Sequence, residues 1–249
     1  MKFRDYFSER SDYYKSYRPT YPDQLFQYLA QLAPTTECAW DCATGSGQAA
    51  LKLASHFDRV LATDASREQI NQATPHAKIE YSIAAETNAG ISDETVDLIT
   101  VAQALHWFDT AAFFSEAQRV LKPGGILAVW TYNLLRVSPA IDPIIHDFYR
   151  HTLNNYWPAE RQLVEEGYRS ITLPFTEIEP ESFQMQHDWN LSQLIGYLGT
   201  WSAVKRYESA TGNDPLHDLA EPLQQAWGEP GAVKKTNWPL SLRIGAKQI

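Results

Sequence analysis

The most constraining feature of this chain is a glycine-spaced loop between a strand-like stretch and a helix-forming stretch. Apolar residues at 38–40 lead into Asp41, and the small residues that follow include Gly45 and Gly47. Glycines let the backbone turn with positive φ and let a ligand approach the main chain closely. The helix that follows would present free N–H groups at its start. A loop that offers these donors together with an acceptor at Asp41 suits a nucleoside-bearing cofactor better than a bare phosphate.

The same loop also satisfies the dinucleotide-binding pattern G-x-G-x-x-[GA], and Asp64 lies 19 residues beyond Gly45. Taken alone, the loop leaves open both a nicotinamide cofactor and S-adenosylmethionine (SAM). A nicotinamide-dependent oxidoreductase would place its glycines directly after an apolar strand, without Asp41. A short-chain reductase would also need a Tyr-x-x-x-Lys pair, and no tyrosine in this chain has a lysine four residues later.

Strand-like and helix-like segments alternate along the first half of the chain. Strands are expected at about 38–42, 59–63, 78–83, 96–101 and 126–132, with helices between them. Such alternation predicts an α/β fold with a doubly wound, mostly parallel, Rossmann-like sheet. A further strand candidate at 183–187 and a period-two segment at 239–246 bring the expected total to seven strands, the last of them antiparallel.

After Tyr132 the alternation stops, and the sequence predicts mainly helix before the final strand. We expect a single domain over 1–249. Its expected parts are an N-terminal aromatic and helical segment at 1–35, a cofactor-binding core at 36–132, a helical cap insertion at 138–170, and the C-terminal part of the sheet at 183–249. A cap in this place would cover the carboxyl ends of the strands, where open α/β sheets bind ligands.

The amino-acid composition limits which classes of molecule this protein is expected to bind. The net charge of −9 and the lack of a basic run argue against a nucleic-acid partner. No apolar run approaches the ~18 residues of a membrane span, and the charged first residues do not resemble a signal peptide. The two cysteines, Cys38 and Cys42, are expected to be core thiols of a cytoplasmic protein. The seven histidines show no metal-ligand spacing, so no metal is expected.

Four further segments follow the glycine loop in a fixed order: Val60–Asp64, Ile83–Glu86, Val96–Asp109 and Arg119–Val129. This series resembles the class I SAM-dependent methyltransferases, of the methyltransferase type 11 kind, over about 36–132. The lead-in at 17–22 and the His106-Trp107-Phe108 signature resemble more specifically the small-molecule branch that includes the trans-aconitate methyltransferases. The resemblance implies SAM as the cofactor and S-adenosylhomocysteine as its product.

The resemblance also implies a set of cofactor contacts, which are Arg18, Asp41, Ala43, Gly45, Gly47, Asp64, Ala65, Ala84, Ala85 and Gln103. Asp64 would accept hydrogen bonds from the two ribose hydroxyls. Arg18 would hold the carboxylate of the cofactor, because a guanidinium can grip it with two parallel hydrogen bonds. The family usually has an acidic residue where this chain has Ala84, so backbone groups of Ala84 and Ala85 would have to contact the adenine.

His106 and Trp107 follow the fourth expected strand, where the methyl group would emerge. His106 is a candidate general base or substrate contact. Trp107, Trp130 and Trp201 are candidate walls of a substrate pocket. The predicted reaction is methyl transfer to a small-molecule acceptor, with O-methylation of a small organic acid favoured. The alternatives are a SAM-binding protein without catalytic activity, a nicotinamide-dependent oxidoreductase, and a nucleic-acid or protein methyltransferase. We expect a monomer or homodimer with no nucleic-acid or membrane partner.

Overall fold

The computed structural model describes residues 19–248 of the 249-residue chain. Two compact units share these residues. The sheet unit contains Tyr21–Asn133, Gln162–Gln184 and the chain from Pro239 onward, and the helical unit contains Leu134–Arg161 and Met185–Trp238. This division differs from the single insertion expected at 138–170. The residues from Gln162 onward group with the sheet, and a second segment of about fifty residues joins the helical unit.

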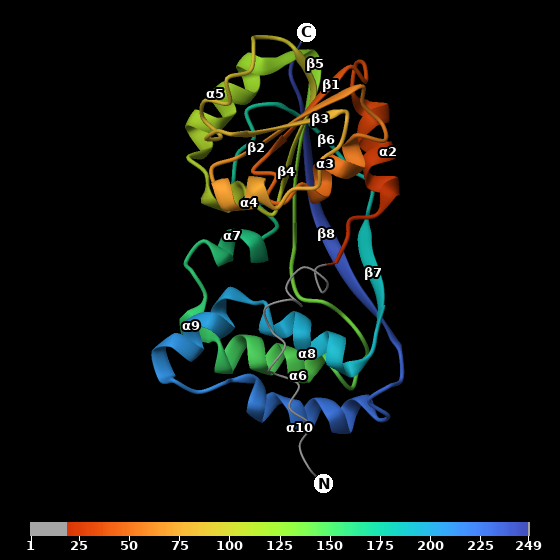
Figure 1. Cartoon of the computed structure of the whole chain (residues 1–249), viewed down its shortest axis with the longest axis vertical. Coiled ribbons are helices and arrows are strands. Elements are labelled where there is room, and N and C mark those ends of the chain that lie inside the picture. Colours follow the sequence, from red (N-terminus) through yellow and green to blue (C-terminus); the bar gives the residue numbers. More distant parts are fainter. Residues whose placement is uncertain (1–18, 249) are drawn as a thin grey trace. The chain divides into compact units, whose positions relative to one another are not determined.

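Within residues 19–248, the sheet unit carries most of the strands, the helices α2 to α5 and most of α7 (Arg161–Glu165) (Figure 1). Its strands are β1 Cys38–Cys42, β2 Arg59–Asp64, β3 Ile79–Ile83, β4 Val96–Ala102, β5 Leu121–Tyr132 and β6 Thr176–Ile178. Its helices include α2 Asp23–Leu32, α3 Gln48–Leu53, α4 Arg67–Asn71 and α5 Thr110–Val120, with a 3₁₀ turn η1 at Leu105–Trp107. Asp109 caps α5 by accepting a hydrogen bond from the Ala112 N–H at 3.2 Å, as its sequence position predicts.

The strand order is β3-β2-β1-β4-β5-β8-β6, with β7 (Gln184–Trp189) also paired to β8 (Lys234–Ala246). Strands β1 to β5 are parallel, and β8 is antiparallel to β5. The expected doubly wound sheet with an antiparallel last strand is therefore confirmed, although the sheet has eight strands and not seven. The order reverses between β1 and β4, so the carboxyl ends of these two strands meet at the switch point where such sheets bind ligands.

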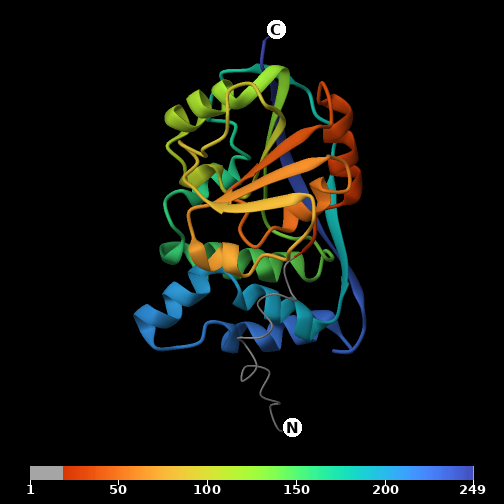
Figure 2. The same cartoon turned by 45° about the horizontal axis from the view of Figure 1, so that its top comes forward.

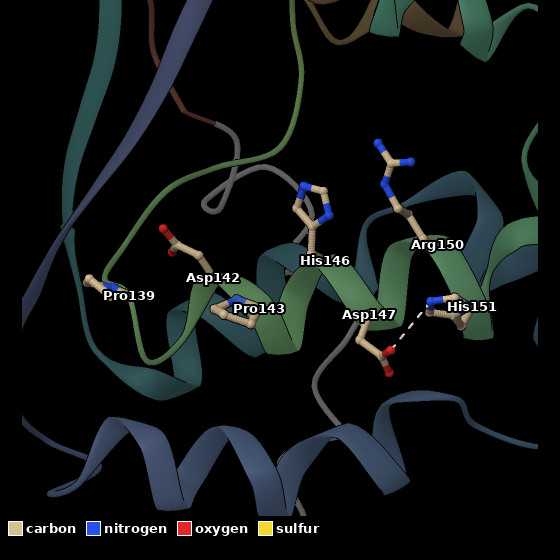
Figure 3. Close-up of a pocket in the computed structure, with 7 residues that line it drawn as sticks. All are labelled: Pro139, Asp142, Pro143, His146, Asp147, Arg150 and His151. Atoms are coloured by element: carbon tan, nitrogen blue, oxygen red, sulfur yellow. Dashed lines mark ion pairs between the residues drawn. The ribbon is translucent and has the colours of Figure 1, made fainter.

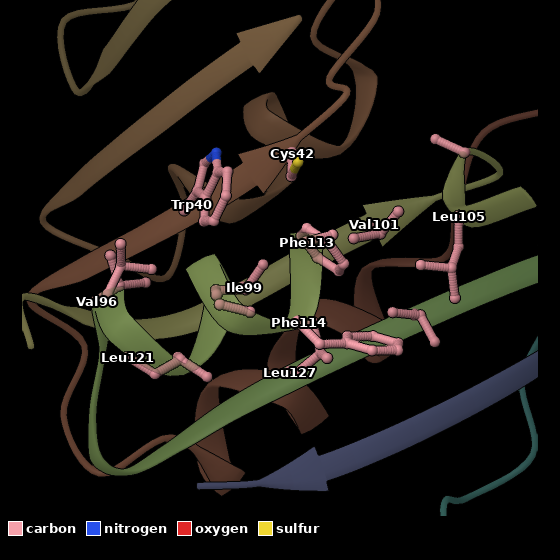
Figure 4. Packing of buried hydrophobic residues seen from close by; sticks show 14 of the residues in the cluster. Trp40, Cys42, Val96, Ile99, Val101, Leu105, Phe113, Phe114, Leu121 and Leu127 are labelled. Atoms are coloured by element: carbon pink, nitrogen blue, oxygen red, sulfur yellow. The ribbon is translucent and has the colours of Figure 1, made fainter. Parts of the chain in front are cut away.

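One apolar cluster fixes the strands against α5. Figure 4 shows Trp40 of β1, Ile99 of β4 and Leu127 of β5 near Phe113 and Phe114 of that helix. Trp40 is fully buried, and its Nε1–H donates to the Thr63 hydroxyl at 2.9 Å. Both cysteines, Cys38 and Cys42, are free and buried, as expected. In both views α2 lies on the other side of the sheet from α5 (Figures 1 and 2).

Short helices make up the helical unit. They are α6 Asp142–Asp147, the π-helical turn η2 Phe148–Thr152, η3 Asn154–Tyr156, α8 Leu191–Gly199, α9 Ser202–Thr211 and α10 Leu216–Trp227; α7 Arg161–Glu165 begins at its border. Asn190 and Gln193 form a reciprocal capping box at the start of α8. Aromatic side chains fill the interior: Trp238 packs on Trp189 and Tyr197, with ring centroids 4.8 and 5.4 Å away. Within residues 19–248 no helix is long and apolar enough to cross a membrane.

Candidate functional site

The loop between β1 and α3 has an unusual backbone. Three alternate residues, Ala43, Gly45 and Gly47, have positive φ values of 55°, 57° and 88°. The two glycines were expected to adopt such angles, and this prediction is confirmed. A positive φ was not expected at Ala43, and this left-handed conformation costs an alanine roughly 1 kcal/mol. Backbone strain that persists at a strand-to-helix loop is typical of a ligand-binding position.

Asp41 lies beneath this loop and is 1% exposed. Its two carboxylate oxygens accept hydrogen bonds from the hydroxyls of Thr44 at 2.5 Å and Thr100 at 2.7 Å, and the backbone N–H of Ala50 donates to the same carboxylate. Burial raises the pKa of Asp41 to about 6, and these hydrogen bonds oppose that rise. Asp41 therefore joins the loop, α3 and β4, and the geometry places it under the binding surface as a support.

Asp64, at the end of β2, faces the loop. One carboxylate oxygen accepts from the Gly45 N–H and the other from the Ser66 N–H, both at 2.8 Å. Each carboxylate oxygen can accept a second hydrogen bond. The side chain is only partly buried. Asp64 thus offers lone pairs beside the glycine loop, where two vicinal hydroxyls of a nucleoside could bind.

Gln103, at the end of β4, also has a strained backbone, with φ 56°. Its amide nitrogen donates to the Tyr132 carbonyl at 3.0 Å, and its amide oxygen accepts from the Thr131 hydroxyl. The side chain expected to face the cofactor is therefore bound to β5. Its clearest role in this structure is to hold the ends of β4 and β5 together.

His106 follows in the η1 turn, beside Trp107, which is 58% exposed. The His106 Nδ1 atom lies 2.9 Å from the hydroxyl of Tyr168, a fully buried residue that the sequence analysis did not single out. Tyr168 and the preceding Gly167 both have positive φ, 61° and 62°. The Arg243 guanidinium donates to the Tyr168 carbonyl at 2.5 Å and fixes this turn. The pairing spans 62 residues, so no local sequence pattern could reveal it.

Comparisons with known proteins agree with this geometry. A methyltransferase domain profile matches residues 40–129. A Dictyostelium discoideum protein described as a methyltransferase is 30% identical over 99% of this chain and 97% of its own length. A solved structure from Anaeromyxobacter dehalogenans, described as a type II methyltransferase, is 41% identical, with a TM-score of 0.89 over 93% of this chain and 99% of that one. The chain belongs to the SAM-dependent methyltransferases.

A more distant structure, from an antibiotic-biosynthesis pathway of Anabaena variabilis, shares only the fold with this methyltransferase. It is 18% identical, with a TM-score of 0.55 over 86% of this chain and 96% of that one. Because the chain belongs to this family of enzymes, two of the alternatives are set aside. These are a nicotinamide-dependent oxidoreductase and a SAM-binding protein without catalytic activity. The closer likeness to the trans-aconitate methyltransferase branch stays a prediction.

The residues at the loop of the methyltransferase could hold the nucleoside part of SAM. At Gly47 a side chain would collide with Tyr81, whose hydroxyl lies 2.4 Å from the position of an added Cβ. Glycine at this position therefore leaves room for the Tyr81 ring against the loop. Asp64 supplies acceptors for hydroxyls. Ala65 follows Asp64 and is exposed. The Ala84 N–H lies 3.2 Å from the Asp64 carbonyl, so Ala84 and the exposed Ala85 lie at the same edge of the sheet as Asp64.

Three other candidates have different surroundings. Trp130 is fully buried, with its ring edge-on to Tyr21 at 5.4 Å and to Phe26 at 6.1 Å, so the structure places it in the core and not at an open pocket wall. Trp201 belongs to the helical unit, where it packs against Phe148, Tyr149, Trp157 and Tyr197. Arg18 lies outside the described residues. The substrate role of Trp201 stays a prediction.

The helical unit has a hollow of its own, about 520 Å³ in volume, along α6 and η2. Figure 3 shows His146 and Arg150 on the same side of this helical stretch, four residues apart. Asp147 pairs with His151 at 3.7 Å, and Asp142 accepts from the backbone of Val137 and Ser138. Among the described residues that line this hollow, the imidazole of His146 and the guanidinium of Arg150 therefore stand outside these pairings. Their spacing of four in a helix is the sequence signal that could have found them.

Proposed function

We propose that this methyltransferase transfers the SAM methyl group to an oxygen of a small organic acid. The observation that carries the proposal is the surroundings of His106. Its Nδ1 atom lies 2.9 Å from the phenol hydroxyl of Tyr168. A carboxylate partner is what usually orients a catalytic histidine and stabilises its protonated form. A histidine held by a phenol suits an acceptor that is already an anion.

Bound SAM supplies a methyl group that its sulfonium already activates. The chain then has to hold the acceptor in line with that methyl group and keep water away. A carboxylic acid is ionised at neutral pH and needs no base. In this proposal Asp64 and the glycine loop hold the cofactor, and His106 with the exposed ring of Trp107 contacts the acceptor.

Cationic side chains should hold the carboxylate of the acceptor. The sequence offers Arg18, Arg136 and Arg206 as candidates. A small acceptor also accords with the net charge of −9, because the phosphate backbone of a nucleic acid would be repelled.

The test is a screen with SAM that carries a tritiated methyl group. Small carboxylic acids, phenols and amines are offered separately, and products are identified by mass spectrometry. A methyl ester releases tritiated methanol in mild alkali, whereas an aryl methyl ether or an N-methyl product does not. Alkali-labile product from an acid is the expected result. Turnover of phenols or amines alone would contradict the proposal while leaving the methyltransferase activity intact.

A hydroxyl acceptor is the second candidate function, and a specific observation favours it. The strained turn at Tyr168, fixed by Arg243, is built to present its hydroxyl to His106. A bond that fixes the ring and tautomer of a histidine is what a general base requires. In that case His106 would remove the proton of the acceptor.

A further inference from the structure

Tyr81, in the middle of β3, carries a hydroxyl that nothing in the sheet unit explains. The side chain is partly exposed, but the hydroxyl oxygen itself is buried. Within residues 19–248 this oxygen has no hydrogen-bond partner. Buried polar atoms in native proteins nearly always have one, so an exception calls for an explanation.

The position of this hydroxyl is specific. Tyr81 pairs with Ala62 of β2, which in turn pairs with Asp41 of β1. The ring reaches across this row to Gly47, with its oxygen 2.4 Å and two ring carbons 3.0 Å from where a Cβ at Gly47 would lie. The unpartnered oxygen therefore lies against the glycine loop, at the start of α3.

The hydroxyl keeps its proton at neutral pH. Burial raises the pKa of Tyr81 above its ordinary value, and the negative charge of Asp41 adds to that rise. Asp41 itself is already supplied with donors from Thr44, Thr100 and Ala50. The hydroxyl is thus a donor that lacks an acceptor, beside a loop that holds an oxygen-rich ligand.

We propose that Tyr81 is a cofactor-binding residue whose hydroxyl donates a hydrogen bond to an oxygen of the bound cofactor, either a ribose hydroxyl or the carboxylate. In the unliganded protein the hydroxyl has lost water without gaining a partner, which is unfavourable. Because it is buried there, a cofactor oxygen reaches it only when the Tyr81 ring or the glycine loop shifts on binding. Binding supplies the missing acceptor and relieves that penalty. The proposal rests on the cofactor alone and does not depend on the identity of the methyl acceptor.

The test compares the wild type with Tyr81→Phe by calorimetry and by thermal unfolding. S-adenosylhomocysteine should bind about three- to tenfold more weakly to the variant, because one hydrogen bond is lost. The unliganded variant should unfold at the same temperature as the wild type or higher, since an unpaired buried hydroxyl has been removed. Tyr28→Phe is the matched control: Tyr28 is on α2 and packs against Phe183, so its loss should leave binding unchanged.

Adenosine distinguishes the two acceptors, because it has the ribose and lacks the carboxylate. If Tyr81→Phe weakens adenosine and S-adenosylhomocysteine equally, the partner is a ribose oxygen. If it weakens only S-adenosylhomocysteine, the partner is the carboxylate. Unchanged affinity for both ligands would overturn the proposal, as would weaker binding accompanied by a lower unfolding temperature, which marks a merely structural hydroxyl. A wild type that fails to bind S-adenosylhomocysteine would overturn it together with the cofactor assignment.

Discussion

Asp64 is the residue expected to contribute most directly to the affinity for the cofactor. Its carboxylate already orders the Gly45 and Ser66 N–H groups, and it has lone pairs left for two hydroxyls. Asp64→Ala should therefore weaken SAM binding ten- to a hundredfold, or about 1.5–3 kcal/mol. Calorimetry measures this.

Ser66→Ala is the control for Asp64→Ala. The Ser66 hydroxyl caps α4 by accepting from the Gln69 N–H, whereas its backbone N–H still reaches Asp64 in the variant. Loss of the cap should lower stability by about 1 kcal/mol and leave the affinity for SAM unchanged. Equal affinities of wild type and Asp64→Ala would remove Asp64 from the binding site.

Asp41 should make the stability of the fold depend on pH. Its pKa rises from 3.8 to about 6 because it is buried, so between these values the folded chain binds more protons than the unfolded chain. Stability must then fall as pH rises through that interval, by about 3 kcal/mol in total. Asp41→Asn lacks the titrating group. In urea unfolding from pH 4 to 7, the wild type should lose stability relative to the variant, and parallel profiles would contradict this expectation.

At the scale of an element, the two glycines of the loop between β1 and α3 should differ in how much stability is lost when each is replaced by alanine. An alanine at Gly45 meets nothing closer than the Gln69 side chain at 3.7 Å, so only backbone strain, roughly 1 kcal/mol, is expected. An alanine at Gly47 adds a collision with Tyr81. Urea unfolding should show Gly47→Ala to be less stable than Gly45→Ala by at least about 1 kcal/mol.

The collision can be tested by a double substitution. Tyr81→Phe removes the oxygen closest to the added methyl group, so it should restore part of the stability lost in Gly47→Ala. In a Gly45→Ala background the same change should restore nothing. If Gly45→Ala and Gly47→Ala lose the same free energy of unfolding, backbone strain alone accounts for the effect of alanine in this loop.

Elements with a strong local signal were predictable from the sequence, and those set by distant contacts were not. The strands from Cys38 to Ala102 and the cap at Asp109 follow from apolar runs and one acidic residue. The stretch at 191–207 forms two helices, because α8 ends at Gly199 and α9 starts after Trp201, which packs into the aromatic interior. Helix α10 has the apolar periodicity of a helix, with Leu216, Leu219, Leu223 and Trp227 buried, but Pro222 inside it is a signal against a helix. The three-residue β6 is too short to show a period.

The candidate site divides in the same way. Gly45, Gly47 and Asp64 belong to one motif and to the neighbouring strand end, so their grouping could be predicted. The support given by Asp41, the bond of Gln103 to β5 and the His106–Tyr168 pair depend on which side chains the finished fold brings together. The bonds from Asp41 to Thr100, from Gln103 to Tyr132 and from His106 to Tyr168 span 59, 29 and 62 residues, and such separations leave no trace in local spacing.

For the whole molecule, the decisive question is whether methyl transfer needs a base. With a carboxylate acceptor, the rate should show no limb in the ordinary titration range of histidine, because the nucleophile is ionised well below it. His106→Gln should then change the KM of the acceptor more than kcat. We expect this outcome. It is measured as a pH–rate profile from pH 5 to 9 with the acceptor that the screen identifies.

Tyr168→Phe completes the argument, because it removes the hydroxyl that bonds to His106 and keeps the ring. If His106 only contacts an anionic acceptor, Tyr168→Phe should resemble His106→Gln and leave the profile flat. If His106 is a base, the wild type should show a limb near pH 6–7, His106→Gln should lose on the order of 10²–10⁴ in rate, and Tyr168→Phe should shift the limb. That second pattern would refute the carboxylate and establish a hydroxyl acceptor, with Tyr168 positioning the histidine.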